Sequence, residues 1–183
     1  DGEAGANPVA SALLQTIARH RLDTAKLIGL VEARRFDLYG EPMQTIADLE
    51  DYARRTTAAL FALAAKILAR IEADEAAEPA GIAYGIAALL RGFPLHAARR
   101  QLYVPVELLD RHNVQTSDVF AGRSSAGLNA ALGELRQLAR DRLVGVGQRL
   151  LKLPPEALPA FLPVALVGPS LRRLERYDAF APA

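Results

Sequence analysis

The stretch Leu90-Arg91-Gly92-Phe93-Pro94-Leu95-His96-Ala97-Ala98-Arg99-Arg100-Gln101-Leu102-Tyr103-Val104-Pro105 lies at the middle of the chain and carries no acidic side chain. It follows an apolar run that begins near Pro79. Because a residue that precedes proline is disfavoured in the helical region, we predict that this helix ends by Phe93. An irregular segment through Val104 is expected next. The stretch therefore predicts a helix end rich in arginine and poor in carboxylate.

Outward from this stretch, the chain divides into helices separated by short breaks. Asn7-Pro8 predicts a helix N-terminus, since asparagine caps a first turn and proline fits its first position. Thr45-Ile46-Ala47-Asp48 resembles a capping box that opens a long helix. No strand-like alternation persists. We predict an all-α fold with helices over about 8–20, 24–39, 45–73, 79–93, 105–112, a short one capped by Ser117, 126–153 and 155–177.

The long helix predicted from Thr45 has apolar side chains at helical spacing. We expect its buried face to consist of Leu49, Tyr52, Leu60, Leu63, Ala64 and Ile67. Four carboxylates follow it closely in the sequence, namely Glu72, Asp74, Glu75 and Glu78. We interpret this acidic run as a solvated connection between helices that binds no ligand.

Composition excludes several classes of function. The 183 residues fit one domain, residues 1–183, and a net charge of +1 gives no field that would attract nucleic acid. The absence of cysteine excludes disulfides and thiol chemistry. No phosphate-binding glycine loop, zinc-binding HExxH or GxSxG serine elbow occurs. Abundant arginine and alanine with little lysine suggest a GC-rich bacterial gene. No apolar run reaches the ~20 residues that span a bilayer.

The opening stretch resembles the second signature of the squalene/phytoene synthase family. That signature reads roughly Gln-Leu-Thr-Asn-Ile-Leu-Arg-Asp-x-x-x-Asp, followed by Gly-Arg-x-Tyr-Leu-Pro, and Leu90, Arg91, Tyr103 and Pro105 stand at matching places. The resemblance extends over nearly the whole chain. It implies an isoprenoid-synthase-like helical bundle that lacks its upstream helices. The family's first Asp-rich motif would then lie before Asp1.

The chain departs from that signature at its chemically important positions. Active members hold Mg²⁺ and a prenyl diphosphate with aspartates that share a helix face. Here these two aspartate positions fall on Gly92 and His96, and imidazole is a poor Mg²⁺ ligand. The family's asparagine, glutamine and diphosphate-binding arginine fall on Ala88, Gly85 and Gln101, although Arg99 or Arg100 could replace the arginine after a shift in register.

A second family element, Val-Ala-Gly-x-Val-Gly, is also changed. Its glycine positions, which leave room for isoprenoid tails in active members, fall on Ala58 and Phe61. Two interpretations of the phenylalanine remain open. Its ring either fills the volume that a tail needs or points elsewhere into the core.

The same replacements resemble a degenerate branch of the family, the phytoene-synthase-like assembly factors of respiratory complex I and their bacterial relatives. Their pattern Leu-Arg-x-x-Pro-x-His-x-x-Arg-Arg is present here. The resemblance implies a binding or structural motif made of Arg91, His96, Arg99, Arg100 and Tyr103, with no catalytic residue, no metal ligand and no cofactor. His96 could equally cap the preceding helix.

Three functions follow from these resemblances. The first is a non-catalytic protein that acts in complex I assembly, with complex I subunits or assembly proteins as partners. It would be cytoplasmic or peripheral at the inner membrane, on the matrix side in a eukaryote. The second is a Mg²⁺-dependent head-to-head prenyl diphosphate synthase, and the third is isoprenoid or lipid binding without turnover.

Overall fold

The computed structural model describes residues 7–176 and 178–180, and within these ranges all regular structure is helical. The all-α prediction is therefore confirmed. In chain order the elements are α1 (Pro8–His20), α2 (Thr24–Arg34), α3 (Phe36–Tyr39), α4 (Ile46–Ala53), the π-helical turn η2 (Arg54–Ala58), α5 (Ala59–Ala69), α6 (Asp74–Arg91), α7 (Phe93–Ala98), α8 (Val106–Arg111), α9 (Thr116–Phe120), α10 (Ala126–Leu143), α11 (Val146–Leu150), the 3₁₀ helix η3 (Pro155–Leu166) and α12 (Val167–Leu174).

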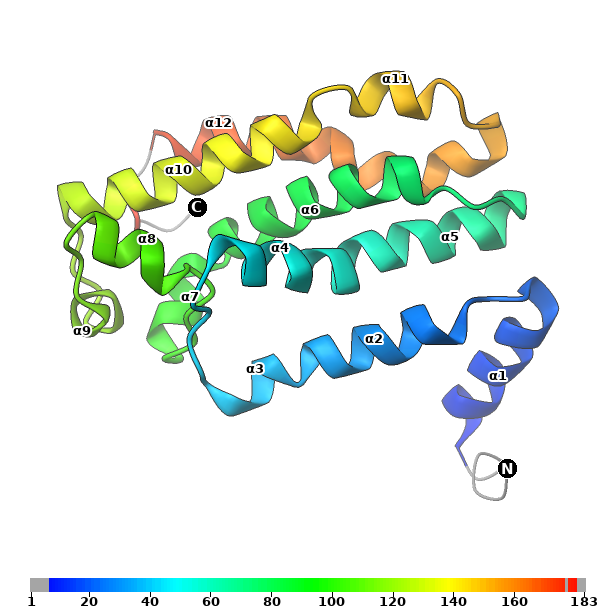
Figure 1. Ribbon diagram of the computed structural model, residues 1–183, viewed down its shortest axis with the longest axis horizontal. Coiled ribbons are helices and arrows are strands. Elements are labelled where there is room, and N and C mark those ends of the chain that lie inside the picture. The colour runs from blue at the N-terminus through cyan, green and yellow to red at the C-terminus, as the bar shows by residue number, and fades with distance from the viewer. Residues whose placement is uncertain (1–6, 177, 181–183) are drawn as a thin grey trace.

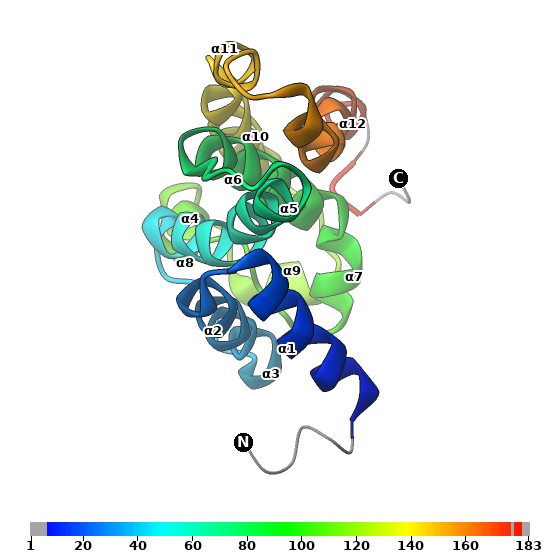
Figure 2. The same ribbon diagram turned by 90° about the vertical axis from the view of Figure 1, so that its right-hand side faces the viewer.

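Helix α6 lies at the centre of the bundle (Figure 1). The row α4–η2–α5 packs on one side of it, and α10 and α12 pack on the other. α2 covers the outside of the first row, and α1 lies at the edge of the bundle (Figure 2). Small residues fill much of α6, and most of its side chains are buried. A helix that is apolar on all sides is expected at such a central position.

Two predicted helix starts are confirmed. The Asn7 side chain accepts hydrogen bonds from the main-chain N–H groups of Val9 and Ala10, at 2.9 and 3.2 Å, and Pro8 occupies the first turn of α1. The capping box at Thr45 is complete, because Thr45 Oγ1 accepts from the Asp48 N–H and the Asp48 carboxylate accepts from the Thr45 N–H. Local sequence alone sets both starts.

The predicted long helix over 45–73 is interrupted by the π-helical turn η2, and it ends at Ala69. A π turn inserts an extra residue, which rotates everything after it by about 100°. Leu49, Tyr52 and Leu63 are buried as predicted, but Leu60 is 48% exposed and Ile67 is 36% exposed. Phe61, Ala62 and Ala65 are buried and Ala64 is partly buried, so the prediction was wrong for Leu60 and Ile67.

The predicted start near Pro79 is wrong, since α6 begins at Asp74, although Glu72 does lie in the connection between α5 and α6. Three of the four carboxylates form ion pairs: Glu72 with Lys66 at 2.6 Å, Asp74 with Lys26 at 2.5 Å and Glu78 with Arg54 at 3.0 Å. Pro79 lies inside α6 as its sixth residue, where it lacks the N–H that would donate to the Glu75 carbonyl. Asp74, Glu75 and Glu78 therefore belong to the first turns of α6 rather than to a loop.

Other boundaries differ from the prediction. The segment after Phe93 is helical, because Pro94 takes an N-terminal position of α7 and does not end the structure there. The helix over 24–39 breaks between α2 and α3, and the one over 126–153 ends at Leu143 before α11. Ser117 lies inside α9 without capping it. The last predicted helix begins as 3₁₀ structure, consistent with its internal prolines, and its expected end at residue 177 lies outside the described residues.

None of the helices in residues 7–176 and 178–180 combines the length and the hydropathy that a membrane crossing requires. Two groups of buried apolar side chains hold the bundle together. The larger lies around α6, α8 and α10 and includes the predicted site residue Tyr103. The smaller, built from Phe61, Phe161 and several alanines, joins α5 and α6 to η3. The candidate site therefore lies at the α7 end of the larger core.

Candidate functional site

The structure brings two of the five predicted motif residues together. The rings of His96 and Tyr103 lie 4.7 Å apart, centroid to centroid, and Tyr103 is buried. The three arginines are exposed at the surface and separate from this pair. Arg100 has a left-handed backbone, and its guanidinium lies over the Phe120 ring at 5.4 Å. The motif is thus a buried aromatic pair with cations around it.

Asp37 of α3 is the polar centre next to this pair. One of its carboxylate oxygens, Oδ1, accepts hydrogen bonds from the Tyr52 and Tyr103 hydroxyls at 2.8 and 2.7 Å. Its other oxygen, Oδ2, accepts from Arg34 Nη1 at 3.0 Å. Gln101 adds a fourth contact by donating to the Asp37 main-chain carbonyl at 2.9 Å. Residues from α2, α3, α4 and the segment after α7 are thereby tied to one carboxylate.

The environment keeps this cluster in one protonation state near neutral pH. Burial raises the pKa of Tyr103 to about 12, and its hydrogen bond to Asp37 acts in the same direction. Burial and the Asp37 hydrogen bond also raise the pKa of Tyr52. Burial lowers the pKa of His96, Arg99 lowers it further, and Asp37 opposes them. Two phenols that donate and a neutral imidazole fit a structural cluster better than an acid–base pair.

The two positions that match the family's aspartates are physically interlocked. A Cβ atom added to Gly92 would lie 2.6 Å from His96 Cε1 and 2.9 Å from His96 Nε2. The imidazole therefore occupies the space into which a side chain at position 92 would project. Within residues 7–176 and 178–180, the His96 ring donates no hydrogen bond to a helix carbonyl. The expectation that His96 caps the preceding helix is therefore not supported there.

Two and three turns before Gly92, the same face of α6 lies directly on the π turn. A Cβ atom at Gly85 would lie 2.6 Å from Thr57 Oγ1, and one at Gly81 would lie 2.2 Å from Ala58 Cα. Thr57 Oγ1 donates to the carbonyls of Ala53 and Gly81 at 2.9 and 2.7 Å and so bridges the two elements. Backbone touches backbone here, and no substrate chain fits between them.

The core beside this face of α6 also contains little empty volume. The cavity bounded by Leu49, Ile86, His96 and Tyr103 measures about 10 Å³, which is the scale of one water. Small-molecule sites commonly need about 300 Å³ or more. Phe61 is buried, and its ring lies 5.7 Å from both Tyr84 and Phe161. The Phe61 ring therefore packs in the smaller core, between α5, α6 and η3.

The residues present do not fit the Mg²⁺ that the family signature implies. Among the residues that the structure describes, no three carboxylate or imidazole groups are arranged to hold a metal ion. The carboxylate nearest the motif, Asp37, already accepts from two hydroxyls and a guanidinium. Mg²⁺ requires several oxygen ligands in near-octahedral geometry, which neither Gly92 nor His96 supplies.

Sequence reasoning missed the carboxylate at the centre of this cluster. Tyr52 was assigned to a buried stripe. Because a buried tyrosine hydroxyl needs a hydrogen-bond partner, that assignment already indicated a polar group nearby in the core. Asp37 stands between Phe36 and Leu38, in a run that reads as part of an amphipathic helix. Because 15 and 66 positions separate Asp37 from Tyr52 and Tyr103, no local pattern connects them.

The helical arrangement defines a protein of the isoprenoid synthase fold. A solved structure with this arrangement is squalene synthase HpnC from Alicyclobacillus acidocaldarius, with a TM-score of 0.83 at 22% identity, covering 92% of this chain and 65% of that one. The squalene/phytoene synthase family profile matches residues 1–181. The chain belongs to the squalene/phytoene synthase family.

Curated relatives carry a different name from the enzymes. NADH dehydrogenase (ubiquinone) complex I, assembly factor 6 from Rattus norvegicus is 29% identical over 180 residues, which cover 96% of this chain and 54% of the relative. The Homo sapiens protein of the same name is also 29% identical, with the same coverage. The chain thus spans about half the length of these relatives. The similarity to these proteins confirms the resemblance to the complex I assembly factors, the degenerate branch of the family.

Proposed function

We propose that this chain belongs to a non-catalytic protein that acts in the assembly of respiratory complex I. One observation carries the proposal: the His96 ring occupies the space in which a side chain at Gly92 would stand. The relatives named as complex I assembly factors support it. The match over residues 1–181 supports a single domain.

Within this proposal the motif residues have two roles. His96 and Tyr103 are structural, since they fix the segment after α7 against Asp37 and its partners. Arg91, Arg99 and Arg100 are exposed cations, available to complex I subunits or other assembly proteins. We place the protein at the inner face of the membrane that holds complex I, as a peripheral component.

Deletion of the gene in its own organism tests the assembly role. We expect NADH-dependent quinone reduction and the amount of assembled complex I to fall, while succinate-dependent respiration stays unchanged. Re-expression of the wild-type gene, and of a variant carrying only Arg19→Gln on the exposed side of α1, should restore both. Normal complex I levels in the deletion strain would overturn the proposal.

The enzymatic alternative predicts a separate measurement. The full-length protein is incubated with Mg²⁺ and farnesyl or geranylgeranyl diphosphate, and released diphosphate is quantified. We expect no release above the background of a heat-denatured sample, because the motif contains no Mg²⁺-binding carboxylate pair. Diphosphate release at an ordinary enzymatic rate would show that the protein is a synthase.

A further inference from the structure

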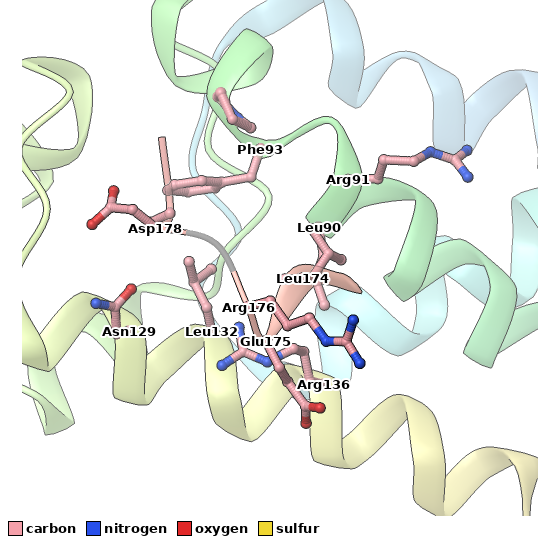
Figure 3. A pocket seen from close by; sticks show the side chains of 12 residues that line it. Leu90, Arg91, Phe93, Asn129, Leu132, Arg136, Leu174, Glu175, Arg176 and Asp178 are labelled. Atoms are coloured by element: carbon pink, nitrogen blue, oxygen red, sulfur yellow. The ribbon is translucent and has the colours of Figure 1, made fainter. Parts of the chain in front are cut away.

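A cleft of about 360 Å³ lies between the end of α6 with α7 on one side and α10 with the end of α12 on the other (Figure 3). A second hollow of about 490 Å³ adjoins it, because both are lined by Arg91, Pro94 and Leu174. Their volumes fall in the usual range of small-molecule sites, about 300–1,000 Å³. The bundle is therefore open here, in contrast to its closed core.

This cleft is distinct from the position of the family's metal motif. Leu90 lines the cleft, whereas a side chain at Gly92 would meet His96 and one at Gly85 would meet the π turn. Leu90 and Phe93 also border the small cavity beside His96 and Tyr103, so these two side chains form a wall shared by the cleft and that cavity.

The cleft is lined by more cations than anions. Arg91, Arg136 and Arg176 line it, and none of them forms an ion pair or a hydrogen bond with another residue in the described ranges. Of the two carboxylates in its wall, Glu175 pairs with Arg140, and Asp178 accepts from the neutral Ser124 hydroxyl. The wall therefore carries an excess of positive charge.

Arg136 shows this imbalance most clearly. It projects from α10 into the cleft and is half-buried (Figure 3). Burial lowers the pKa of its guanidinium, with Arg140 acting in the same direction and Glu175 opposing them. A partly desolvated cation without a partner is unfavourable unless an anion joins it.

Another cleft of the molecule provides an internal comparison. The hollow between α2, η2 and α6 has a similar volume, about 340 Å³, and is also lined by cations. There, however, Lys26, Arg54 and Arg55 each pair with a carboxylate, at 2.5, 3.0 and 2.9 Å. Charge in that hollow is neutralised within the chain. The unpaired arginines are thus a specific feature of the cleft beside α10.

Apolar side chains continue from the arginines to the surface. Phe93, Leu132 and Leu174 form the inner wall of the cleft, and the adjoining hollow adds Leu95 and Leu166. These last two are 54% and 57% exposed, so the apolar path reaches solvent. A ligand that fills both hollows must combine a compact anionic group with an apolar chain.

We infer that this cleft binds an amphiphile with an anionic phosphate head group, which Arg91, Arg136 and Arg176 contact while its chain lies along Leu174, Leu166 and Leu95. A phospholipid and a free phosphate ester share the head-group chemistry. The inference goes beyond the proposed role in complex I assembly. Ligand binding in the cleft and the amount of assembled complex I are measured in separate experiments, so either proposal can fail alone.

Titration calorimetry of the wild-type protein with three soluble probes separates these sources. The probes are monomeric dihexanoyl phosphatidylglycerol, dihexanoyl phosphatidylcholine, whose head group is zwitterionic, and inorganic phosphate. We expect phosphatidylglycerol to bind at least about tenfold more tightly than either of the others. If phosphatidylcholine binds as tightly as phosphatidylglycerol, the role of the arginines is refuted. If inorganic phosphate binds as tightly as phosphatidylglycerol, the role of the apolar side chains is refuted. If none of the probes binds, both roles are refuted.

Variants locate the site. Arg91→Gln and Arg136→Gln should each weaken phosphatidylglycerol binding by about tenfold, as expected for the loss of a charge-assisted contact. Leu166→Ser should weaken binding of that lipid without changing phosphate binding. Arg19→Gln on α1 removes the same charge far from the cleft and should have no effect. If Arg136→Gln fails to fold, the result for Arg91→Gln tests the site alone, because Arg91 is exposed and its replacement should not disturb the fold. If Arg19→Gln weakens phosphatidylglycerol binding as much as Arg91→Gln does, the inference is overturned.

Discussion

The two faces of α6 differ in what the neighbouring helices allow. On one face Gly81 and Gly85 touch the backbone and side chains of the π turn, and His96 covers Gly92. On the other face Leu90 lines a cleft of about 360 Å³ with unpaired arginines. The first face corresponds to the metal motif of the family's enzymes, and the second does not.

The two faces therefore differ in the space beside them and not only in their side chains. Gly81 and Gly85 allow α6 to pack closely on the π turn, because a Cβ at either position would meet Ala58 or Thr57. Of these two faces, the one toward α10 and α12 borders the cleft of about 360 Å³.

The largest expected effect on stability comes from adding a Cβ atom on the closed face of α6, which packs against the π turn. In Gly81→Ala the new Cβ would lie 2.2 Å from Ala58 Cα, and because backbone cannot move aside locally, we expect a loss of about 3 kcal/mol in the free energy of unfolding. Urea denaturation measures it. The matched control is Gly133→Ala on α10, whose Cβ would meet only Arg136 Nη2 at 3.5 Å and should be neutral or stabilising by up to about 1 kcal/mol. Equal losses would show that the faces do not differ.

The polar cluster beside the closed face ranks second. Asp37→Asn removes the charge that accepts from Tyr52, Tyr103 and Arg34, and we expect a loss of about 2 kcal/mol. The pKa of Tyr103, about 12 in the wild type, should also fall toward its ordinary value of about 10, because the nearby negative charge is gone. Tyrosinate absorbance during an alkaline titration reports it, with Tyr103→Phe as the reference. An unchanged titration would contradict the assigned hydrogen bond.

The interlock between Gly92 and His96 should appear as a coupling of about 1 kcal/mol. Gly92→Ala places a Cβ 2.6 Å from the imidazole and destabilises the fold, but a side chain can shift more readily than backbone. In a His96→Ala background the same substitution should cost nothing or even stabilise the helix end. A double-mutant cycle of unfolding free energies measures the coupling. Additive losses would mean that the ring does not occupy that space.

The smallest effect concerns pH. Burial and Arg99 lower the pKa of His96 below its ordinary value of about 6.5, so the folded state favours the neutral ring. This stabilisation is complete above about pH 6.5 and is lost as the pH falls through the lowered pKa. Arg99→Gln should raise that pKa in an NMR titration of the imidazole, whereas Arg149→Gln should leave it unchanged. Equal shifts in both variants would argue against a local interaction with Arg99.

Local features of the fold were predictable because neighbouring residues determine them. The caps at Asn7 and Thr45 and the all-helical class follow from side chains within one turn of each other. The π turn was not predictable, since periodicity assumes a constant rotation per residue, and Leu60 and Ile67 were misplaced for that reason. Pro94 was misread because proline ends one helix or begins another according to the packing around it.

The sequence by itself determined which chemistry is missing. The side chains of Gly92 and His96 contain no oxygen atom that could bind Mg²⁺, whatever the fold. Only the tertiary structure decided what took the place of that chemistry. Contacts between residues far apart in the chain depend on helix packing, and these contacts gather Asp37 with two tyrosines, place an imidazole over Gly92 and leave Arg91 and Arg136 facing one cleft.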